Sequence, residues 1–223
     1  MFNLFAKDRS DQPPQIRDAL FGDMPLDAFL GAKQETHDAE PWASFERVRI
    51  LIESNDPQGA AQILHAILAM PQFESRCYLQ AWHVLRQLGE QPGPDSVKQL
   101  LGIVVEVGVP KGLDLVAAYA DHHARYYNFS GAGVVREHPN DSLDAAIDNL
   151  LKLGASVVRA IGPWKEARPG PPAKDEARLN FLTPSGLHFG QGPMAALSKD
   201  RMAGPVLAAA FQLMQQLIAQ TKR

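Results

Sequence analysis

The chain is poor in cysteine, in surplus positive charge and in long apolar runs, and each shortage excludes a class of protein. Its one cysteine, Cys77, cannot form an intramolecular disulfide, and a zinc site built on several thiolates is excluded. With 22 basic and 25 acidic residues, the formal net charge is −3. The basic excess that general nucleic-acid binding requires is therefore absent. No run approaches the roughly 20 apolar residues of a membrane helix.

These shortages also indicate where the protein acts. A signal peptide carries its charges before an apolar stretch, whereas Lys7, Asp8 and Arg9 follow a short apolar start. A low cysteine content is typical of reducing compartments. We therefore expect a cytoplasmic protein that binds neither membranes nor nucleic acids. Cys77 lies in an apolar helical pattern, where we expect a small buried hydrophobe.

What is present is ordinary globular material: 223 residues, 45% of them hydrophobic. Residues 1–40 are mixed in character, so we expect a loosely ordered or short helical segment. Residues 41–90 follow helical spacing. Gln91-Pro92-Gly93-Pro94 is the strongest boundary signal in the chain. Residues 95–223 form the second region, and within it residues 162–178 are rich in proline and charge, which is typical of a surface loop.

Three helices are predicted within residues 41–90. Asp56 followed by Pro57 is typical of a helix N-cap and first helical position. The order of these elements, a helix, a tight turn, a helix, a proline and a third helix, resembles a tetratricopeptide-type repeat. Phe45 and Leu79 are 34 positions apart, which is the length of such a repeat. The resemblance covers less than a quarter of the chain and lacks the full pattern of the repeat. It implies a repeat-like pair within a small helical layer.

Two short stretches beyond residue 95 have the same pattern of proline and glycine, and they indicate the architecture of the second region. Val109-Pro110-Lys111-Gly112-Leu113 and Thr183-Pro184-Ser185-Gly186-Leu187 each lie between apolar, β-prone runs. Proline suits the first position of a type I turn, and glycine suits the left-handed position that follows it. Each stretch therefore predicts a hairpin with a three-residue loop.

The remaining patterns complete the second region. A third strand is expected at residues 124–129, continued by residues 134–136, with helices at about 140–161 and 205–220. The predicted fold class is α+β: a helical layer followed by an antiparallel sheet of five strands in the order βββ-α-ββ-α. This broad plan is similar to that of profilin-like, roadblock-like and GAF-like domains. No motif selects one of them, and fold alone does not supply a function.

The densest group of polar side chains lies at residues 121–128, at the turn before the third expected strand. Side chains alternate along a strand, so Arg125 and Tyr127 share a face. A site at these strand ends would suit a small-molecule-binding domain or a metal-dependent hydrolase. The alternative is a solvated turn that holds no ligand. The candidate ligand-binding residues are Glu106, His122, Arg125, Tyr127 and His188.

Glu106 is a carboxylate in the middle of a continuous apolar strand. Burying it there costs several kcal/mol unless it is paired. Three interpretations stay open. Glu106 forms a structural pair with Arg125 across the hairpin, it is exposed on an edge strand, or it is a general base with a raised pKa.

No arrangement of nucleophile and base, and no metal-ligand spacing, is evident. Ser130 lacks the glycine two residues before it that a nucleophile elbow requires, and Phe189-Gly190-Gln191-Gly192-Pro193 lacks the lysine of a phosphate loop. We therefore predict a non-enzymatic protein-interaction or adaptor protein without cofactor or metal. It would bind a partner, or a second copy of itself, through a sheet edge or the 162–178 loop. Trp164 is either an exposed partner-binding anchor or a cap over a helix end.

Overall fold

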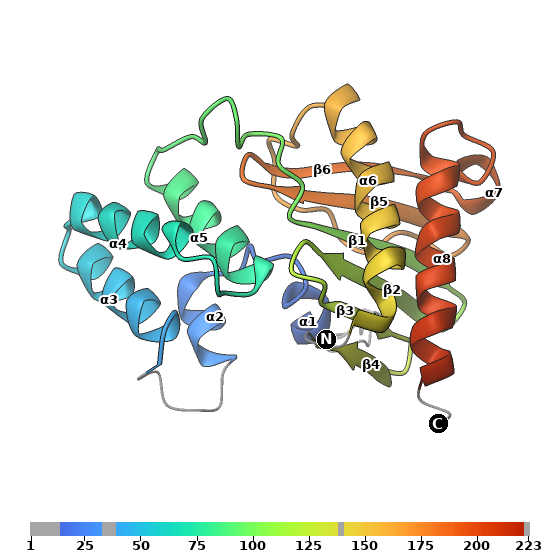
Figure 1. Cartoon of the computed structure of the whole chain (residues 1–223), viewed down its shortest axis with the longest axis horizontal. Coiled ribbons are helices and arrows are strands. Elements are labelled where there is room, and N and C mark those ends of the chain that lie inside the picture. The colour runs from blue at the N-terminus through green and yellow to red at the C-terminus, as the bar shows by residue number, and fades with distance from the viewer. Residues whose placement is uncertain (1–13, 33–38, 138–140, 221–223) are drawn as a thin grey trace, which may run out of the picture.

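A computed structural model describes residues 14–32, 39–137 and 141–220. Within these residues, a group of N-terminal helices lies beside a six-stranded antiparallel sheet, and two long helices cover the other side of that sheet (Figure 1). The α+β fold class expected from the sequence is confirmed. Of residues 1–40, for which a loosely ordered or short helical segment is expected, residues 1–13 and 33–38 lie outside the described residues.

The N-terminal helices enclose a core of their own. Phe45, Leu64 and Leu85, one from each of the three longer helices, are fully buried in it. The start of the middle one follows from the sequence, because the Asp56 carboxylate accepts a hydrogen bond of 2.9 Å from the Gly59 N–H. The likeness to a tetratricopeptide repeat stays a prediction. The helices are α1 (Pro14–Asp18), α2 (Leu26–Gly31), α3 (Trp42–Glu53), α4 (Pro57–Ala69) and α5 (Ser75–Gln87).

The sheet has the strand order β4-β3-β2-β1-β5-β6, and all neighbouring strands are antiparallel. Both predicted hairpins form, with loops of two residues rather than three, because Val109 pairs with Gly112 and Thr183 with Gly186. Both glycines have a positive φ, of 152° and 113°, which favours glycine, but neither lies in the left-handed helical region expected in a three-residue loop. The strands are β1 (Gly102–Val109), β2 (Gly112–Tyr119), β3 (Ala124–Tyr127), β4 (Gly133–Arg136), β5 (Glu176–Thr183) and β6 (Gly186–Pro193).

The prediction that residues 134–136 continue β3 is wrong. The chain reverses first, because the Asn128 N–H donates to the Ala132 carbonyl and the Gly131 N–H donates to the Asn128 carbonyl, both at 2.9 Å. Gly131 has a φ of 84°, which favours glycine. The glycine-rich stretch, which suggested an interruption within one strand, forms the turn between the two strands β3 and β4. β4 therefore runs back along β3 as an edge strand.

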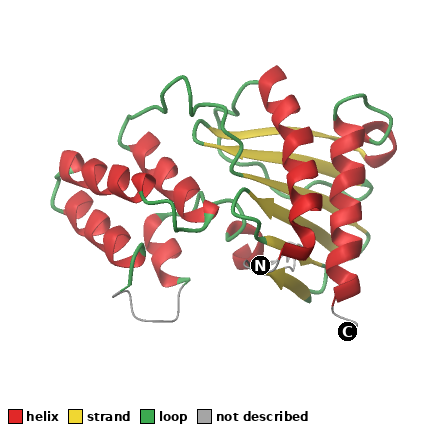
Figure 2. Ribbon diagram, in the orientation of Figure 1, coloured by secondary structure: helices red, strands yellow, loops and turns green. Residues whose placement is uncertain are grey.

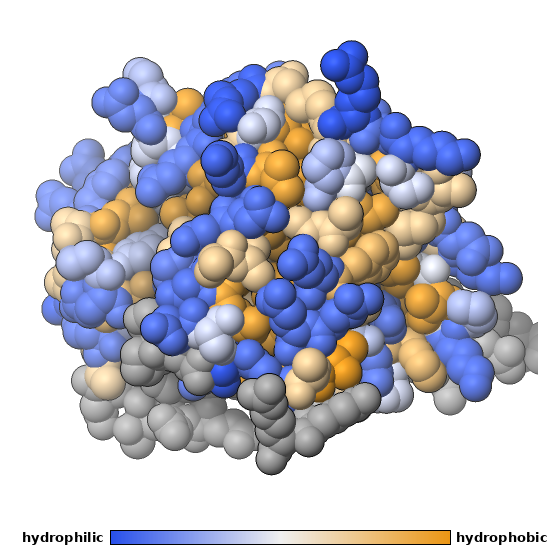
Figure 3. Space-filling view, turned by 45° about the vertical axis from the view of Figure 1, so that its right-hand side comes forward, coloured by the Kyte–Doolittle hydropathy of each residue, from blue (hydrophilic) through white to orange (hydrophobic). Residues whose placement is uncertain are grey.

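Two long helices, α6 (Asp144–Ala160) and α8 (Ala203–Gln220), cover one face of the sheet (Figure 2). Ile103 and Phe181 point into this layer, and Gly154 lets α6 approach closely, because a Cβ there would lie 2.4 Å from Ile103 Cδ1. Figure 3 brings the side of α8 forward and shows apolar residues interspersed with hydrophilic ones. The short helices Asp141–Leu143 (η1) and Met194–Leu197 (α7) precede α6 and α8.

The opposite face of the sheet is covered by α1, by the segment after it and by one side of α5. Leu20 and Phe21 pack with Leu79 of α5 against the β1–β2 region. The hydroxyl of the fully buried Tyr119 donates to the Leu20 carbonyl at 2.7 Å. The N-terminal segment is thus part of the sheet's second hydrophobic layer. No helix in the described ranges is both long and apolar enough to cross a membrane.

Candidate functional site

The five residues that the sequence nominated do not meet at one place. Glu106, Arg125 and Tyr127 lie on the sheet face that α1 covers, as the register of β1, β2 and β3 dictates. His188 pairs with Phe181 and so lies on the opposite face, toward α6. His122 contacts α6 as well, since its Nε2 lies 2.9 Å from Asp148 Oδ1. The single pocket that these residues were expected to line is therefore not formed.

The polar residues at the β2–β3 turn have structural partners. Arg125 Nη2 lies 3.6 Å from the carboxylate of Glu74 at the start of α5. His122, with a φ of 63°, lies between the carboxylates of Asp144 and Asp148 on α6. Over the described part of the chain, no three histidine, cysteine, aspartate or glutamate side chains gather in a way that could hold a metal ion. The turn therefore joins the sheet to both helical layers.

Asp121 fixes the start of α5 to this turn. Its Oδ2 accepts the Ser75 N–H at 2.5 Å, the Asp121 N–H donates to Ser75 Oγ at 3.1 Å, and its Oδ1 lies 3.2 Å from His123 Nδ1. Burial alone would raise the pKa of Asp121, but the hydrogen bonds from His123 and Ser75 lower it below its ordinary value of 3.8. The Asp121 carboxylate beside its ring in turn raises the pKa of His123 above 6.5.

Replacing Asp121 with asparagine is expected to lower the free energy of unfolding at pH 6 by about 1–3 kcal/mol, because a charged acceptor of buried hydrogen bonds is lost. A carboxyl group whose pKa is lowered by folding stabilises the fold at pH values above its pKa in the unfolded chain. This contribution is lost as the pH falls through its pKa in the folded protein. A histidine whose pKa is raised by folding makes its full contribution to stability below pH 6.5. This contribution is lost as the pH rises through the pKa of the histidine in the folded protein. The gap between wild type and Asp121→Asn should therefore narrow below pH 4. Urea titrations from pH 2.5 to 8 test this, and a gap that is constant across that range would contradict it.

Glu106 is fully buried and paired, but its partners are not the one expected. Arg17 Nε lies 2.5 Å from its Oε1, Arg178 Nη1 lies 3.2 Å from its Oε2, and the Asn180 amide donates to Oε2 at 3.1 Å. Arg125 cannot reach it, because Arg125 pairs with Ala117 of β2, whereas β5 places Arg178 directly opposite Glu106. The exposed interpretation of Glu106 is excluded, and the structural pair holds with different arginines.

The same arginines hold the loop between α6 and β5 over the sheet. Arg17 Nη2 and Arg178 Nη1 donate to the Pro169 carbonyl at 2.8 and 3.2 Å. Further along the loop, the Asp175 N–H donates to the Gly108 carbonyl at 3.0 Å. The loop and the segment around α1 are thus pinned to the same buried carboxylate.

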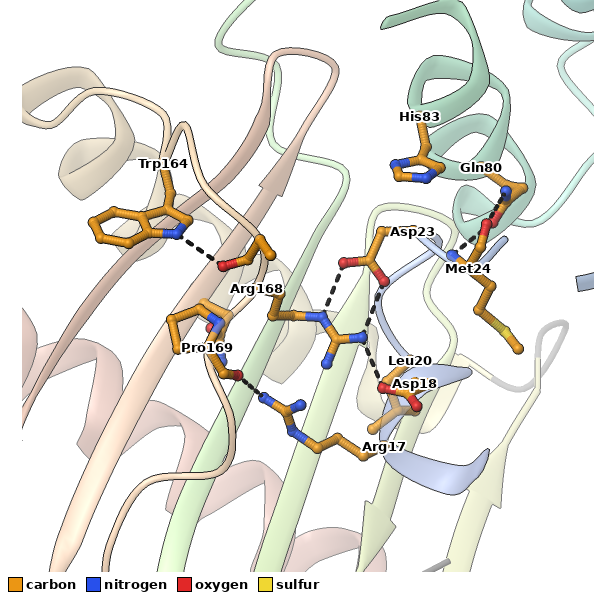
Figure 4. Close-up of polar contacts among 12 residues, drawn as sticks. Arg17, Asp18, Leu20, Asp23, Met24, Gln80, His83, Trp164, Arg168 and Pro169 are labelled. Atoms are coloured by element: carbon orange, nitrogen blue, oxygen red, sulfur yellow. Dashed lines mark hydrogen bonds and ion pairs between the residues drawn. The ribbon is translucent and has the colours of Figure 1, made fainter. Parts of the chain in front are cut away.

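This pinning leaves a cleft of about 750 Å³ between the helices and the sheet. Its walls are the segment 17–23, one side of α5, the loop residues 163–168 and the β5–β6 turn (Figure 4). The hydroxyls of Thr183 and Ser185 line the turn. The charged lining residues are four cations, Arg17, Arg86, Lys165 and Arg168, and three carboxylates, Asp18, Asp23 and Glu166.

Arg168 bridges two walls of the cleft. Its Nε donates to Asp23 Oδ2 at 2.9 Å and its Nη2 donates to Asp18 Oδ1 at 2.8 Å (Figure 4). Its guanidinium lies 4.0 Å from the centre of the Phe21 ring. Burial alone would lower the pKa of Arg168, but the two carboxylates raise it above its ordinary value. This cation is therefore neutralised within the protein.

Arg86, near the end of α5, is bound differently. Its Nη1 donates to the Pro184 carbonyl at 2.6 Å, and it forms no ion pair with any residue that the structure describes. Burial lowers the pKa of Arg86, and the charge of Asp23, which Arg168 already holds, offsets this only in part. His83, one turn earlier, has its pKa lowered by burial and then by Arg86, so its ring is neutral at pH 7.

Trp164 forms the outer wall of the cleft and is 41% exposed. Its backbone N–H donates to the Leu187 carbonyl at 2.6 Å, and its indole Nε1 donates to the Ala167 carbonyl at 3.1 Å. The ring meets Phe189 edge-on, with 5.1 Å between centroids. Trp164 therefore lies against the edge strand β6 rather than over the end of α6. Of its two expected roles, the exposed one agrees with this position, and partner binding stays a prediction.

Sequence reasoning missed Arg86 and Arg168. Arg168 lies in the proline- and charge-rich loop and Arg86 near the end of a helix, and neither belongs to a motif. Arg86 acquires its position because α5 lies beside the β5–β6 turn, nearly 100 residues away along the chain. Only the long-range packing brings these charges together, so no local signal would have found them.

No family model matches the chain, and neither the curated proteins nor the solved structures contain a match to it.

Proposed function

We propose that this is a non-enzymatic, cytoplasmic interaction protein that holds an extended segment of a partner protein in the cleft between its helices and its sheet. The observation that carries the proposal is Trp164, which is 41% exposed at the cleft wall although three contacts fix it in place. Tryptophan is enriched among the residues that dominate binding energy. A side chain that is ordered beforehand also loses little entropy when a ligand binds.

The surroundings of Trp164 support this function. The cleft volume of about 750 Å³ falls in the range of roughly 300–1,000 Å³ typical of ligand sites. β6, beside Trp164, is an edge strand of the sheet, and because the Trp164 N–H already takes its Leu187 carbonyl, a peptide would add to the edge beyond that residue. Extended peptides commonly bind by adding to such an edge. A peptide segment would therefore meet an aromatic anchor, a strand edge and a charged cleft together.

An enzymatic role has less support. Ser185 Oγ lies 3.1 Å from Nε2 of the fully buried His188, a contact typical of a nucleophile and its base. The same hydroxyl, however, lies 2.9 Å from Thr183 Oγ1. The Ser185 hydroxyl is thus shared within the hairpin turn, where it supplies a partner to a buried imidazole. That structural role accounts for the contact without a reaction.

Trp164→Ala is expected to weaken binding of partner-like peptides at least about tenfold, as loss of a central aromatic anchor does. Peptides of about 10 residues, long enough to fill a strand-edge groove, would be selected from a displayed random library with the wild-type protein. Their affinities would then be measured by fluorescence anisotropy. Ile50→Ala is the matched control, because Ile50 is 50% exposed and lies on α3, outside the cleft. A library without binders, or selected peptides that bind Trp164→Ala as tightly as wild type, would contradict the proposal.

A further inference from the structure

We infer that the free edge of the Arg86 guanidinium is a receptor for a carboxylate, so that the segment held in the cleft is acidic. This inference rests on the proposed function for the identity of the partner, but not for the existence of the receptor. Arg86 lines the cleft together with Trp164, so a single segment placed there meets both residues.

The guanidinium is oriented in advance. Its Nη1 donates to the Pro184 carbonyl at 2.6 Å, which fixes the plane of the group. Its Nε and Nη2 hydrogen-bond to no residue that the structure describes. The N–H groups of these two nitrogens form the fork that donates side by side to the two oxygens of a carboxylate. Arg86 therefore presents a bidentate site whose orientation needs no ligand.

Gly186 lies over one face of this guanidinium. A Cβ added there would lie 3.8 Å from both Arg86 Cζ and Nε and 4.0 Å from Nη2, so it would stack on the face of the group and leave the Nε–Nη2 edge uncovered. The positive φ of the β5–β6 turn, 113°, favours glycine at this position. The turn that orients Arg86 through Pro184 thus also packs over one face of the guanidinium.

The balance of charge in the cleft favours one carboxylate over a phosphate. Arg17 is paired with Glu106, and Arg168 with Asp18 and Asp23, whereas Arg86 is half-buried and forms no ion pair with a described residue. A half-buried cation gains most from one charge-assisted partner. The four cations and three carboxylates of the lining leave a surplus of one positive charge (4 − 3), which one carboxylate balances, whereas a phosphate carries up to two negative charges.

The receptor can be tested on the full chain without knowing the partner. The Nε–Hε resonances of the arginines are followed by NMR in ¹⁵N-labelled protein, and Arg86→Lys identifies the Arg86 signal by its loss. Sodium acetate is titrated against sodium chloride of equal ionic strength, and sodium phosphate is titrated in parallel. We expect acetate to shift the Arg86 signal saturably, at millimolar concentration. The Arg168 signal, from a group that is already paired, should stay in place.

The peptide arm uses the selected binders. An acidic binder and the same peptide with glutamine for each glutamate are compared on wild type, Arg86→Lys and Arg86→Gln. Arg86→Lys retains the charge but not the fork, and Arg86→Gln retains neither. Both variants should therefore bind the acidic peptide about tenfold or more weakly than wild type, as expected for the loss of a bidentate charged pair. The glutamine peptide should bind all three proteins equally.

The possible failures are distinguishable. If acetate moves the Arg86 signal no more than chloride does, or if phosphate moves it more than acetate, the carboxylate receptor is wrong even where peptides bind through Trp164. If acetate shifts the signal saturably but the library contains no binders, the receptor stands and the proposed function is overturned.

Discussion

Glu106→Gln is expected to lower the free energy of unfolding by about 3–5 kcal/mol, the cost of breaking a buried ion pair from one side. Glutamine has nearly the same shape, so packing is preserved while the charge disappears. Arg178 and Arg17, whose side chains are only 3% and 12% exposed, would then lie beside each other without the anion between them. Because both also hold the Pro169 carbonyl, we expect the loop and the segment around α1 to loosen first.

Urea denaturation followed by circular dichroism measures the stability change, and hydrogen exchange locates it. Amide protons in residues 17–23 and 163–175 should exchange faster in Glu106→Gln than in wild type. The control is Glu137→Gln, at an exposed position with no hydrogen bond or ion pair to the described residues, which should leave the stability unchanged. A Glu106→Gln protein as stable as wild type would show that the buried carboxylate does not hold the two segments together.

Gly108→Val is the second large effect that we expect, a loss of about 3 kcal/mol in unfolding free energy, at the upper end of overpacking costs. A Cβ at Gly108 would lie 2.0 Å from the Ala173 carbonyl oxygen and 2.9 Å from that of Pro172. These are backbone atoms, so the whole loop has to lift off β1. The hydrogen bond from the Asp175 N–H to the Gly108 carbonyl would be lost with it.

Lifting the loop should also remove binding, because the loop carries Trp164. Selected peptides are therefore expected to bind Gly108→Val at least about tenfold more weakly than wild type. Gly170→Val is the matched control in the same loop, since nothing lies within 4 Å of a Cβ at that position. Equal stability and peptide affinity for the two valine variants would refute the close packing of loop and strand as the support of the cleft.

The elements whose signals are local could be predicted from the sequence. Asp56 and Pro57 start α4 as expected, and both proline–glycine turns close hairpins. β4 was misjudged because a glycine-rich stretch reads the same whether it interrupts a strand or reverses it. The register of the following strand decides between these possibilities, and pairing with β3 rather than sequence sets that register.

The site could not be predicted, because its residues are brought together by packing alone. Glu106 was correctly identified as a carboxylate that requires a partner. Its arginines come from α1 and β5, 89 and 72 residues away. Alternation within a strand places Arg125 and Tyr127 on one face, but it does not show that His188 lies on the other. Strand order decided that outcome, and neither spacing nor composition encodes strand order.

The cleft between the helices and the sheet is expected to bind an acidic segment of a partner protein. The most direct test is a backbone ¹H–¹⁵N NMR titration of the full chain with the tightest acidic peptide from the library. We predict that the largest shifts fall on the cleft walls, in residues 17–23, in the second half of α5, in residues 163–168 and in the β5–β6 turn. Shifts concentrated instead on α6 and α8, or on the outer face of α3, would place the binding surface elsewhere and contradict the claim.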